Sequence, residues 1–175
     1  MRGVLAVGDR VSLVRPRAHD RGEFLAAVQA SETLHGAWVF PPNGVAEFNA
    51  YLRRGRDADA VAALVRDRAT DAIVGVINLN NVIRGGLQQC FVGYYAFAGF
   101  EQRALMTDGL RTMVRYAFDE LELHRIEANI QPGNTGSKAL ARRCGFQLEG
   151  FSPQYLLVGG LLRDHERWAI INEKR

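Results

Sequence analysis

The stretch Leu123-His-Arg-Ile-Glu-Ala-Asn-Ile-Gln-Pro-Gly-Asn-Thr-Gly-Ser-Lys-Ala-Leu-Ala-Arg-Arg-Cys-Gly145 sets out a strand, a turn and a helix in direct succession. The pattern predicts a strand over 125–130, and the Pro-Gly pair that follows is typical of a turn. Asn134 is a favoured residue for capping the start of a helix, and glycine often follows the last helical residue, so a helix is expected over 134–144. A strand that leads into a helix favours parallel pairing within a sheet.

Strand and helix patterns also cover the rest of the chain. Apolar residues repeat at helical spacing over 105–121 and predict a long amphipathic helix. The meander over 61–97 and the final hairpin around Gly159-Gly160 favour antiparallel pairing, whereas helices between strands require parallel pairing. We therefore expect an α/β fold with a mixed, mostly antiparallel sheet. The expected strands are 11–15, 61–66, 73–79, 89–97, 125–130, 146–158 and 162–171, and shorter helices are expected at 20–31 and around 48–52, on either side of an apolar loop over 34–44.

Composition places the chain among ordinary globular domains. With 175 residues, 47% hydrophobic and 23% charged, it can bury a core without disulfides or metals, and no linker or repeat divides it, so one domain over 1–175 is expected. The net charge of +3 is too small for a protein that wraps nucleic acid. Cys90 and Cys144 match no metal-ligand spacing and indicate core thiols in a reducing compartment. Met1–Arg10 has no apolar run of signal-peptide or membrane-spanning length, so a cytoplasmic protein is expected.

Two features carry candidate chemistry. The strand over 89–97 leads into the helix over 105–121, whose first N–H groups suit a phosphate, although every long helix begins in this way. Ser137 lies one turn into the helix over 134–144, on the face that it shares with Leu140 and Cys144, and it is expected to point inward. A buried hydroxyl needs a hydrogen-bond partner, and a nearby backbone carbonyl is the alternative to a functional group.

Four stretches share a pattern with one superfamily of enzymes: 123–150, Tyr155-Leu-Leu-Val-Gly-Gly160, Arg163-Asp-His-Glu-Arg-Trp168 and the loop Trp38-Val-Phe-Pro-Pro42. Together they resemble the GCN5-related N-acetyltransferase (GNAT) superfamily, and within it the RimJ/RimL-type ribosomal-protein N-terminal acetyltransferases. The resemblance spans nearly the whole chain and implies a bacterial, cytoplasmic acetyltransferase with the GNAT fold. The implied cofactor is acetyl-CoA, wedged between two splayed central parallel strands, 89–97 and 125–130, which are flanked by helices.

The resemblance assigns cofactor-binding positions. Backbone groups of Tyr94, Tyr95 and Ala96 would pair with the pantetheine arm and the acetyl carbonyl, and Asn134 would bond the pantetheine region. The family pattern Gln/Arg-x-x-Gly-x-Gly/Ala is replaced by Glu101-x-x-Ala104-x-Met106, which brings a negative charge toward phosphates and removes the freedom of a glycine. Acetyl-CoA binding is therefore expected to be weaker than is usual in the family, with Arg103 offsetting part of the charge. The implied pyrophosphate loop is Gln102, Arg103, Ala104, Leu105, Met106 and Thr107.

The resemblance also assigns catalytic positions. Ser137 matches a hydroxyl that protonates the leaving thiolate. The two positions for a glutamate base hold Leu156 and Asn129, neither of which accepts a proton. Glu127 shares the strand face of Asn129 and is the nearest carboxylate, with a structural ion pair to a neighbouring arginine as the alternative. A chain of water molecules is the preferred base. The acceptor must then arrive neutral, which favours an α-amine over a lysine, because the pKa of an α-amine is roughly 2.5 units lower.

The expected acceptor pocket combines Trp38, Phe40 and Tyr155 with Asn129 and with the hairpin around His165. Trp38 fits either a pocket wall or a core aromatic position. His165 lies in the charged run 163–167, and a structural or surface role is the alternative to proton transfer. No metal site is predicted.

The sequence therefore favours an acetyl-CoA-dependent N-acetyltransferase whose acceptor is a protein N-terminal α-amine or a small-molecule amine. A non-catalytic acyl-CoA-binding or regulatory protein with a degenerate cofactor loop is the alternative. An RNA-binding module has only the pI of about 9.1 in its favour. The expected partners are acetyl-CoA and the amine acceptor, without nucleic acid or membrane, and a homodimer through sheet edges or the last hairpin would follow family habit.

Overall fold

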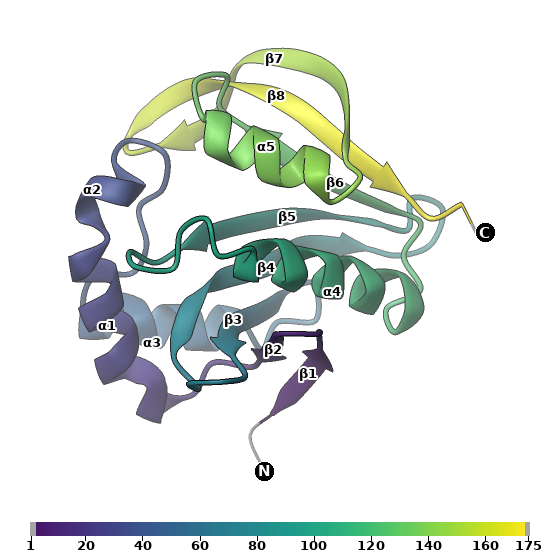
Figure 1. The fold of residues 1–175 in the computed structure, drawn as a ribbon. Coiled ribbons are helices and arrows are strands. Elements are labelled where there is room, and N and C mark those ends of the chain that lie inside the picture. The colour runs from purple at the N-terminus through teal and green to yellow at the C-terminus, as the bar shows by residue number, and fades with distance from the viewer. Residues whose placement is uncertain (1–2, 174–175) are drawn as a thin grey trace.

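The protein is built on one eight-stranded sheet with helices on both faces (Figure 1). The computed structural model describes residues 3–173; Met1 and Arg2, where the stretch considered for a signal peptide begins, lie outside the described residues. The strand order is β1-β2-β3-β4-β5-β6-β8-β7, and only β5 and β6 are parallel neighbours. This confirms the expected mixed, mostly antiparallel sheet. The strands are β1 (Val4–Val7), β2 (Val11–Val14), β3 (Val61–Asp67), β4 (Ile73–Ile83), β5 (Gln89–Ala96), β6 (Arg125–Ile130), β7 (Gln147–Val158) and β8 (Leu161–Ile171); the helices are η1 (Ala18–Asp20), α1 (Arg21–Ala30), α2 (Glu32–His35), α3 (Val45–Arg54), α4 (Leu105–Asp119) and α5 (Thr135–Arg143).

The parallel strands β5 and β6 separate part-way along their length. Three residue pairs join them, from Gln89–Arg125 to Phe91–Glu127. In the described chain their pairing ends there, although β5 runs on to Ala96 and β6 to Ile130. The splay implied by the resemblance is therefore present, and it opens the middle of the sheet.

Each face of the sheet has its own core. On one face α4 buries Leu110, Met113 and Ala117 completely, at the helical spacing that predicts this helix. On the other face α1 and α3 bury Phe24 and Phe48, whose ring centroids lie 4.9 Å apart. Packing from both sides fixes β4 and β5, so the open part of the sheet borders a rigid wall.

Three short elements, β1, η1 and α2, are not predicted by the sequence patterns. Each has four residues or fewer, so its stability depends on contacts from elsewhere in the chain. The turn between β1 and β2, for example, is held by the Asp108 carboxylate of α4, which accepts hydrogen bonds from the backbone N–H groups of Arg10 and Val11 at 2.8 and 3.0 Å. β4 also runs to Ile83, beyond the expected end at 79.

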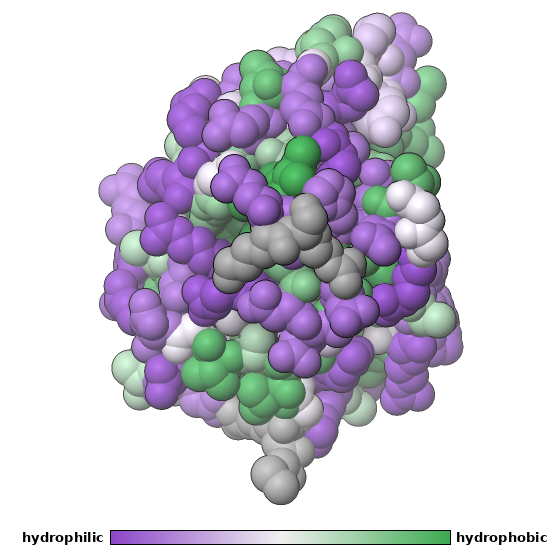
Figure 2. All heavy atoms as spheres, turned by 90° about the vertical axis from the view of Figure 1, so that its right-hand side faces the viewer, coloured by the Kyte–Doolittle hydropathy of each residue, from purple (hydrophilic) through white to green (hydrophobic). Residues whose placement is uncertain are grey.

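The two cysteines are buried free thiols, as expected for core positions. Burial raises the pKa of Cys90 to about 12, so this thiol keeps its proton. Within residues 3–173, no helix has the length and apolar character needed to cross a membrane. Figure 2 shows a largely hydrophilic surface on the side that lies to the right in Figure 1, with hydrophobic side chains in small separate groups.

Candidate active site

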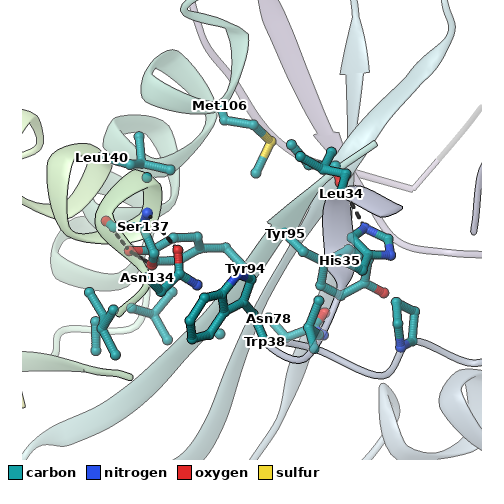
Figure 3. Close-up of a pocket in the computed structure, with 18 of the residues that line it drawn as sticks. Leu34, His35, Trp38, Asn78, Tyr94, Tyr95, Met106, Asn134, Ser137 and Leu140 are labelled. Atoms are coloured by element: carbon teal, nitrogen blue, oxygen red, sulfur yellow. Dashed lines mark hydrogen bonds between the residues drawn. The ribbon is translucent and has the colours of Figure 1, made fainter. Parts of the chain in front are cut away.

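A cavity of about 1570 Å³ opens where β5 and β6 separate. Its walls come from these two strands, Asn78 of β4, the starts of α4 and α5, the segment over 34–43, the inner side of α3 and the β7–β8 hairpin. Figure 3 shows Asn134 and Ser137 on one side and His35 on the other, with Tyr94 and Trp38 between them. Small-molecule sites typically measure about 300–1,000 Å³, so this cavity has room for two reactants.

Ser137 and Tyr94 form a hydroxyl pair across the opening between α5 and β5 (Figure 3). The Ser137 hydroxyl donates to the Tyr94 oxygen at 3.0 Å, and the Tyr94 hydroxyl donates to the Ser137 carbonyl at 3.1 Å. Burial raises the pKa of Tyr94 to about 12, so the phenol stays protonated at neutral pH. The partner of the Ser137 hydroxyl is therefore a side chain, not the backbone carbonyl considered as an alternative.

Asn134 caps α5, as its sequence position predicts. Its Oδ1 accepts a hydrogen bond from the Ser137 backbone N–H at 3.1 Å. The side-chain NH₂ group of Asn134 remains a donor at the cavity wall. One residue can thus serve both the helix and a ligand, because a carboxamide has both an acceptor and a donor.

The edge of β5 that faces the cavity contains Tyr94, Tyr95 and Ala96. Their other edge pairs with β4, so the backbone groups that point toward β6 have no strand partner in the described chain. The Ala96 carbonyl is fixed by a hydrogen bond of 2.9 Å to Nε2 of His35, whose ring also packs edge-on against Tyr95. Sequence patterns do not identify His35, because α2 has only four residues and gives no helical period.

The loop before α4 enters the cavity wall with a strained backbone. Ala104 adopts the left-handed conformation, with φ of 60°, at the N-cap position of α4. The Glu101 carboxylate accepts a hydrogen bond from the backbone N–H of Gly99 at 2.7 Å. Of the predicted loop residues, Gln102, Ala104, Leu105, Met106 and Thr107 line the cavity. The Arg103 guanidinium instead lies over the Phe100 ring, and among the described wall residues the nearby cations are Arg111 and Arg143.

The other end of the cavity is bounded by the segment over 34–43. Trp38 and Phe40 are 40% and 62% exposed and line the cavity, so Trp38 belongs to a wall and not to a core. Trp38 rests on Gly133, and Phe40 rests on Gly159 at the hairpin turn, where a Cβ would lie 2.9 Å and 2.5 Å from the respective rings. The segment thus spans the opening between the β6–α5 turn and the β7–β8 hairpin.

The remaining predicted site residues divide into two groups. Asn129 and Leu156 line the cavity, so the two expected base positions are present at the site without a carboxylate. Glu127 is not part of the described wall; its carboxylate accepts a hydrogen bond of 2.8 Å from Arg125, as in the ion-pair alternative. Tyr155 also lies outside the described wall and contacts the ring of His165, which does line the cavity.

A family model described as Acetyltransferase (GNAT) domain matches residues 10–147. This chain belongs to the GNAT acetyltransferase family. The match covers β2 to the start of β7, including both strands of the splay and the helices α4 and α5. The family expected from the residue pattern is therefore confirmed.

Individual GNAT proteins are also similar to this chain. The "Probable N-acetyltransferase YjcK" of Bacillus subtilis is 39% identical over 102 residues, 58% of this chain and 56% of the relative. The "[Ribosomal protein uS5]-alanine N-acetyltransferase" of Escherichia coli is 40% identical over 98 residues, 56% of this chain and 50% of the relative. The chain thus spans about half the length of these curated relatives. The solved structure "Mycobacterium smegmatis RimJ in complex with CoA-disulfide" has a TM-score of 0.85 and 25% identity, and the match covers 94% of this chain and 83% of that one.

Proposed function

We propose that this GNAT domain transfers the acetyl group of acetyl-CoA to a primary amine, and that a protein N-terminal α-amine is the acceptor it fits best. The observation that carries the proposal is the cavity between the separated strands, with the Ser137–Tyr94 hydroxyl pair on its wall. Similarity to an enzyme named for acetylating an alanine of ribosomal protein uS5 supports the α-amine acceptor. Similarity to a RimJ solved with a CoA-disulfide supports acetyl-CoA as the donor.

The residues of the cavity fit acetyl-CoA. The unpaired edge of β5 offers backbone groups over Tyr94–Ala96 for the amides of the pantetheine arm, and the Asn134 side chain adds a donor. The loop over 102–107 and the start of α4 present backbone N–H groups to phosphates, with Arg111 and Arg143 as the nearby positive charges. Acetyl-CoA, when bound, supplies a thioester carbonyl that an amine nitrogen can attack.

The Ser137–Tyr94 pair places two protonated hydroxyl groups on the wall. Ser137 is the hydroxyl that would protonate the leaving sulfur, and Tyr94 fixes the rotamer of Ser137 by accepting its hydrogen bond. Asn129 presents a second feature of the site: its Oδ1 is buried without a hydrogen-bond partner among the described residues. A buried acceptor left unpaired costs about 1–3 kcal/mol, and an N–H of the bound amine would satisfy it.

Release of free thiol from acetyl-CoA tests the function. The protein is incubated with acetyl-CoA and a panel of peptides with free N-termini, beginning with alanine and serine, and with small primary amines. Transfer gives one free thiol for each acetylated amine. A non-catalytic acyl-CoA-binding protein would be stabilised by the cofactor without releasing thiol, and this outcome would replace the proposal by that alternative. Mass spectrometry of protein N-termini from cells with and without the gene then identifies the acceptor.

Two substitutions in the loop before α4 should strengthen the binding of acetyl-CoA. Glu101→Arg with Ala104→Gly is expected to lower the dissociation constant of acetyl-CoA by up to about tenfold, because one charge-assisted contact of roughly 1.5 kcal/mol is gained. Glycine also adopts the φ of 60° at residue 104 without the cost that alanine bears. Calorimetric titration measures the effect. Gln154→Gly is the matched control for the glycine substitution, because Gln154 also has a positive φ, of 46°, but lies on β7. Unchanged or weaker binding by the double variant would contradict this account of the loop.

A further inference from the structure

We propose that His165 of β8 takes up the proton that the acceptor amine loses as it is acetylated, in place of the chain of water molecules expected from the sequence. The inference rests on the proposed function and assigns its proton acceptor. His165 lies in a charged run, yet its side chain is only 3% exposed and lines the cavity. Histidine is buried less often than aliphatic residues, so the burial of His165 at the cavity wall is the first observation behind the inference.

One hydrogen bond fixes which nitrogen of His165 carries the proton. Nδ1 lies 2.9 Å from the backbone carbonyl oxygen of Arg163, and a carbonyl oxygen only accepts, so Nδ1 is the donor. In the neutral ring Nε2 then has a free lone pair. Among the described residues, no hydrogen bond to this atom is present. The ring is therefore oriented as in enzymes where one nitrogen is anchored to the backbone and the other is available as a base.

The sheet register places His165 beside Asn129. Asn129 of β6 pairs with Arg167 of β8, and Ile130 pairs with Glu166. Side chains alternate along a strand, so His165 is on the same face as Arg167 and Asn129, one step further toward the end of β6. Two acceptors, Nε2 of His165 and the unpartnered Oδ1 of Asn129, thus share a face of the sheet. A primary amine has the complementary donors.

The groups around His165 leave it free for this role. The Tyr155 ring of β7 packs edge-on against the imidazole, with centroids 6.4 Å apart. Arg163 and Arg167 share its face of β8 and provide the nearby charges; both are positive and take no proton. The Arg167 guanidinium is directed to Gly150, where its Nη2 lies 2.6 Å from the position of a Cβ. From the segment over 34–43, the aromatic residues Trp38 and Phe40 line the same cavity.

Three carboxylates at or near the cavity are less suited than His165 to take up this proton. Glu47 of α3 and Glu101 of the cofactor loop line the cavity, but both are exposed, and Glu101 is engaged by the N–H of Gly99. Glu127 is paired with Arg125. Histidine is also the side chain best suited to take up and release a proton near neutral pH.

The proton balance of the step is complete. The neutral amine nitrogen forms a bond to the thioester carbonyl carbon and becomes positively charged, and one of its protons moves to Nε2 of His165. The C–S bond then breaks, and the sulfur leaves with the electron pair and takes a proton from the Ser137 hydroxyl. The imidazolium releases its proton to water and the Ser137 oxygen regains one from water, so an amide and a thiol are the only net products.

Nitrogen-15 NMR of the free protein tests the geometry without turnover. We expect the His165 signals to show a protonated Nδ1 and an unprotonated Nε2, and the Nε2 signal to shift when a peptide amine binds to the protein loaded with CoA. His165→Asn identifies the signals. A protonated Nε2 with a bare Nδ1, or an Nε2 signal that the peptide leaves unmoved, would overturn the inference.

Kinetics of two substitutions complete the test. His165→Asn retains a side-chain NH₂ that can bond the Arg163 carbonyl but lacks the Nε2 lone pair. Its kcat/KM should therefore fall at least about tenfold, while CoA affinity and Tm stay unchanged. His19→Asn is the control, because the His19 side chain is 61% exposed and lies outside the described wall. If His165→Asn does not fold, His165→Gln, which places an amide near the position of Nε2, takes its place. If the wild type is active and the His165→Asn protein is equally active, His165 is not the proton acceptor, and water or Glu47 takes that role. If the wild type shows no acetyl transfer at all, the proposed function itself is rejected.

Discussion

A peptide with a free α-amine should be acetylated roughly 300-fold faster at pH 7 than an N-terminally blocked peptide that offers a lysine instead. The two positions where a glutamate base is expected, at Asn129 and Leu156, lie at the cavity without a carboxylate. An amine must therefore enter this site neutral. The ordinary pKa of an α-amine is about 2.5 units below that of a lysine, which corresponds to about 3.4 kcal/mol in the cost of deprotonation.

The pH dependence of the rate separates this explanation from simple shape selection. Between pH 7 and 8.5 the rate with an α-amine should rise, because the neutral fraction of the substrate rises as the pH passes its pKa. For peptides whose α-amines differ in pKa, the pH–rate profiles should be displaced along the pH axis by the differences in pKa. Asn129→Asp, which introduces a carboxylate at the wall, should reduce the difference in acetylation rate between the α-amine peptide and the lysine peptide. Equal acetylation of the lysine peptide, or profiles independent of the peptide, would refute the proposed origin of selectivity.

Ser137→Ala should lower kcat by about 10²-fold or more while acetyl-CoA affinity changes little. The Ser137 hydroxyl contacts Tyr94 at the wall of the cavity, and its removal takes away the group that we propose as the proton donor for the leaving sulfur. The fold should be retained, because the Asn134 cap binds the backbone N–H of residue 137, which alanine keeps. Alanine is also a favourable residue within a helix.

Two further substitutions show whether the hydroxyl or the helix is responsible. Thr135→Ala removes a hydroxyl from the same turn of α5 at an exposed position outside the described wall, and should leave turnover unchanged. Tyr94→Phe keeps the Ser137 hydroxyl but removes its hydrogen-bond acceptor, so it should lower kcat less than Ser137→Ala. Single-turnover kinetics and calorimetry measure chemistry and binding separately. A Ser137→Ala protein with nearly full turnover would assign Ser137 a structural role only.

Residue patterns alone established the long elements of the fold. The amphipathic period of α4, the capped start of α5 at Asn134 and the β-rich runs of β3, β5, β6 and β8 are local signals, because each depends on residues close together in the chain. The motif residues around 123–150 also identified the family. The same sequence left β1, η1 and α2 unpredicted, since elements of four residues or fewer are stabilised by partners distant in sequence, such as Asp108 for the turn after β1.

Some features of the site likewise depend on residues close together in the chain, and others depend on residues far apart in it. Helical spacing in the sequence already places Ser137 on the inner face of α5, and positions 129 and 156 hold no carboxylate. The three-dimensional fold was needed to show that Ser137 pairs with Tyr94, that Glu127 binds Arg125, and that His165 is buried at the cavity. The physical reason is that helix faces and strand alternation follow from backbone geometry a few residues long, whereas hydrogen-bond partners and burial depend on which strands become neighbours across the splay of β5 and β6.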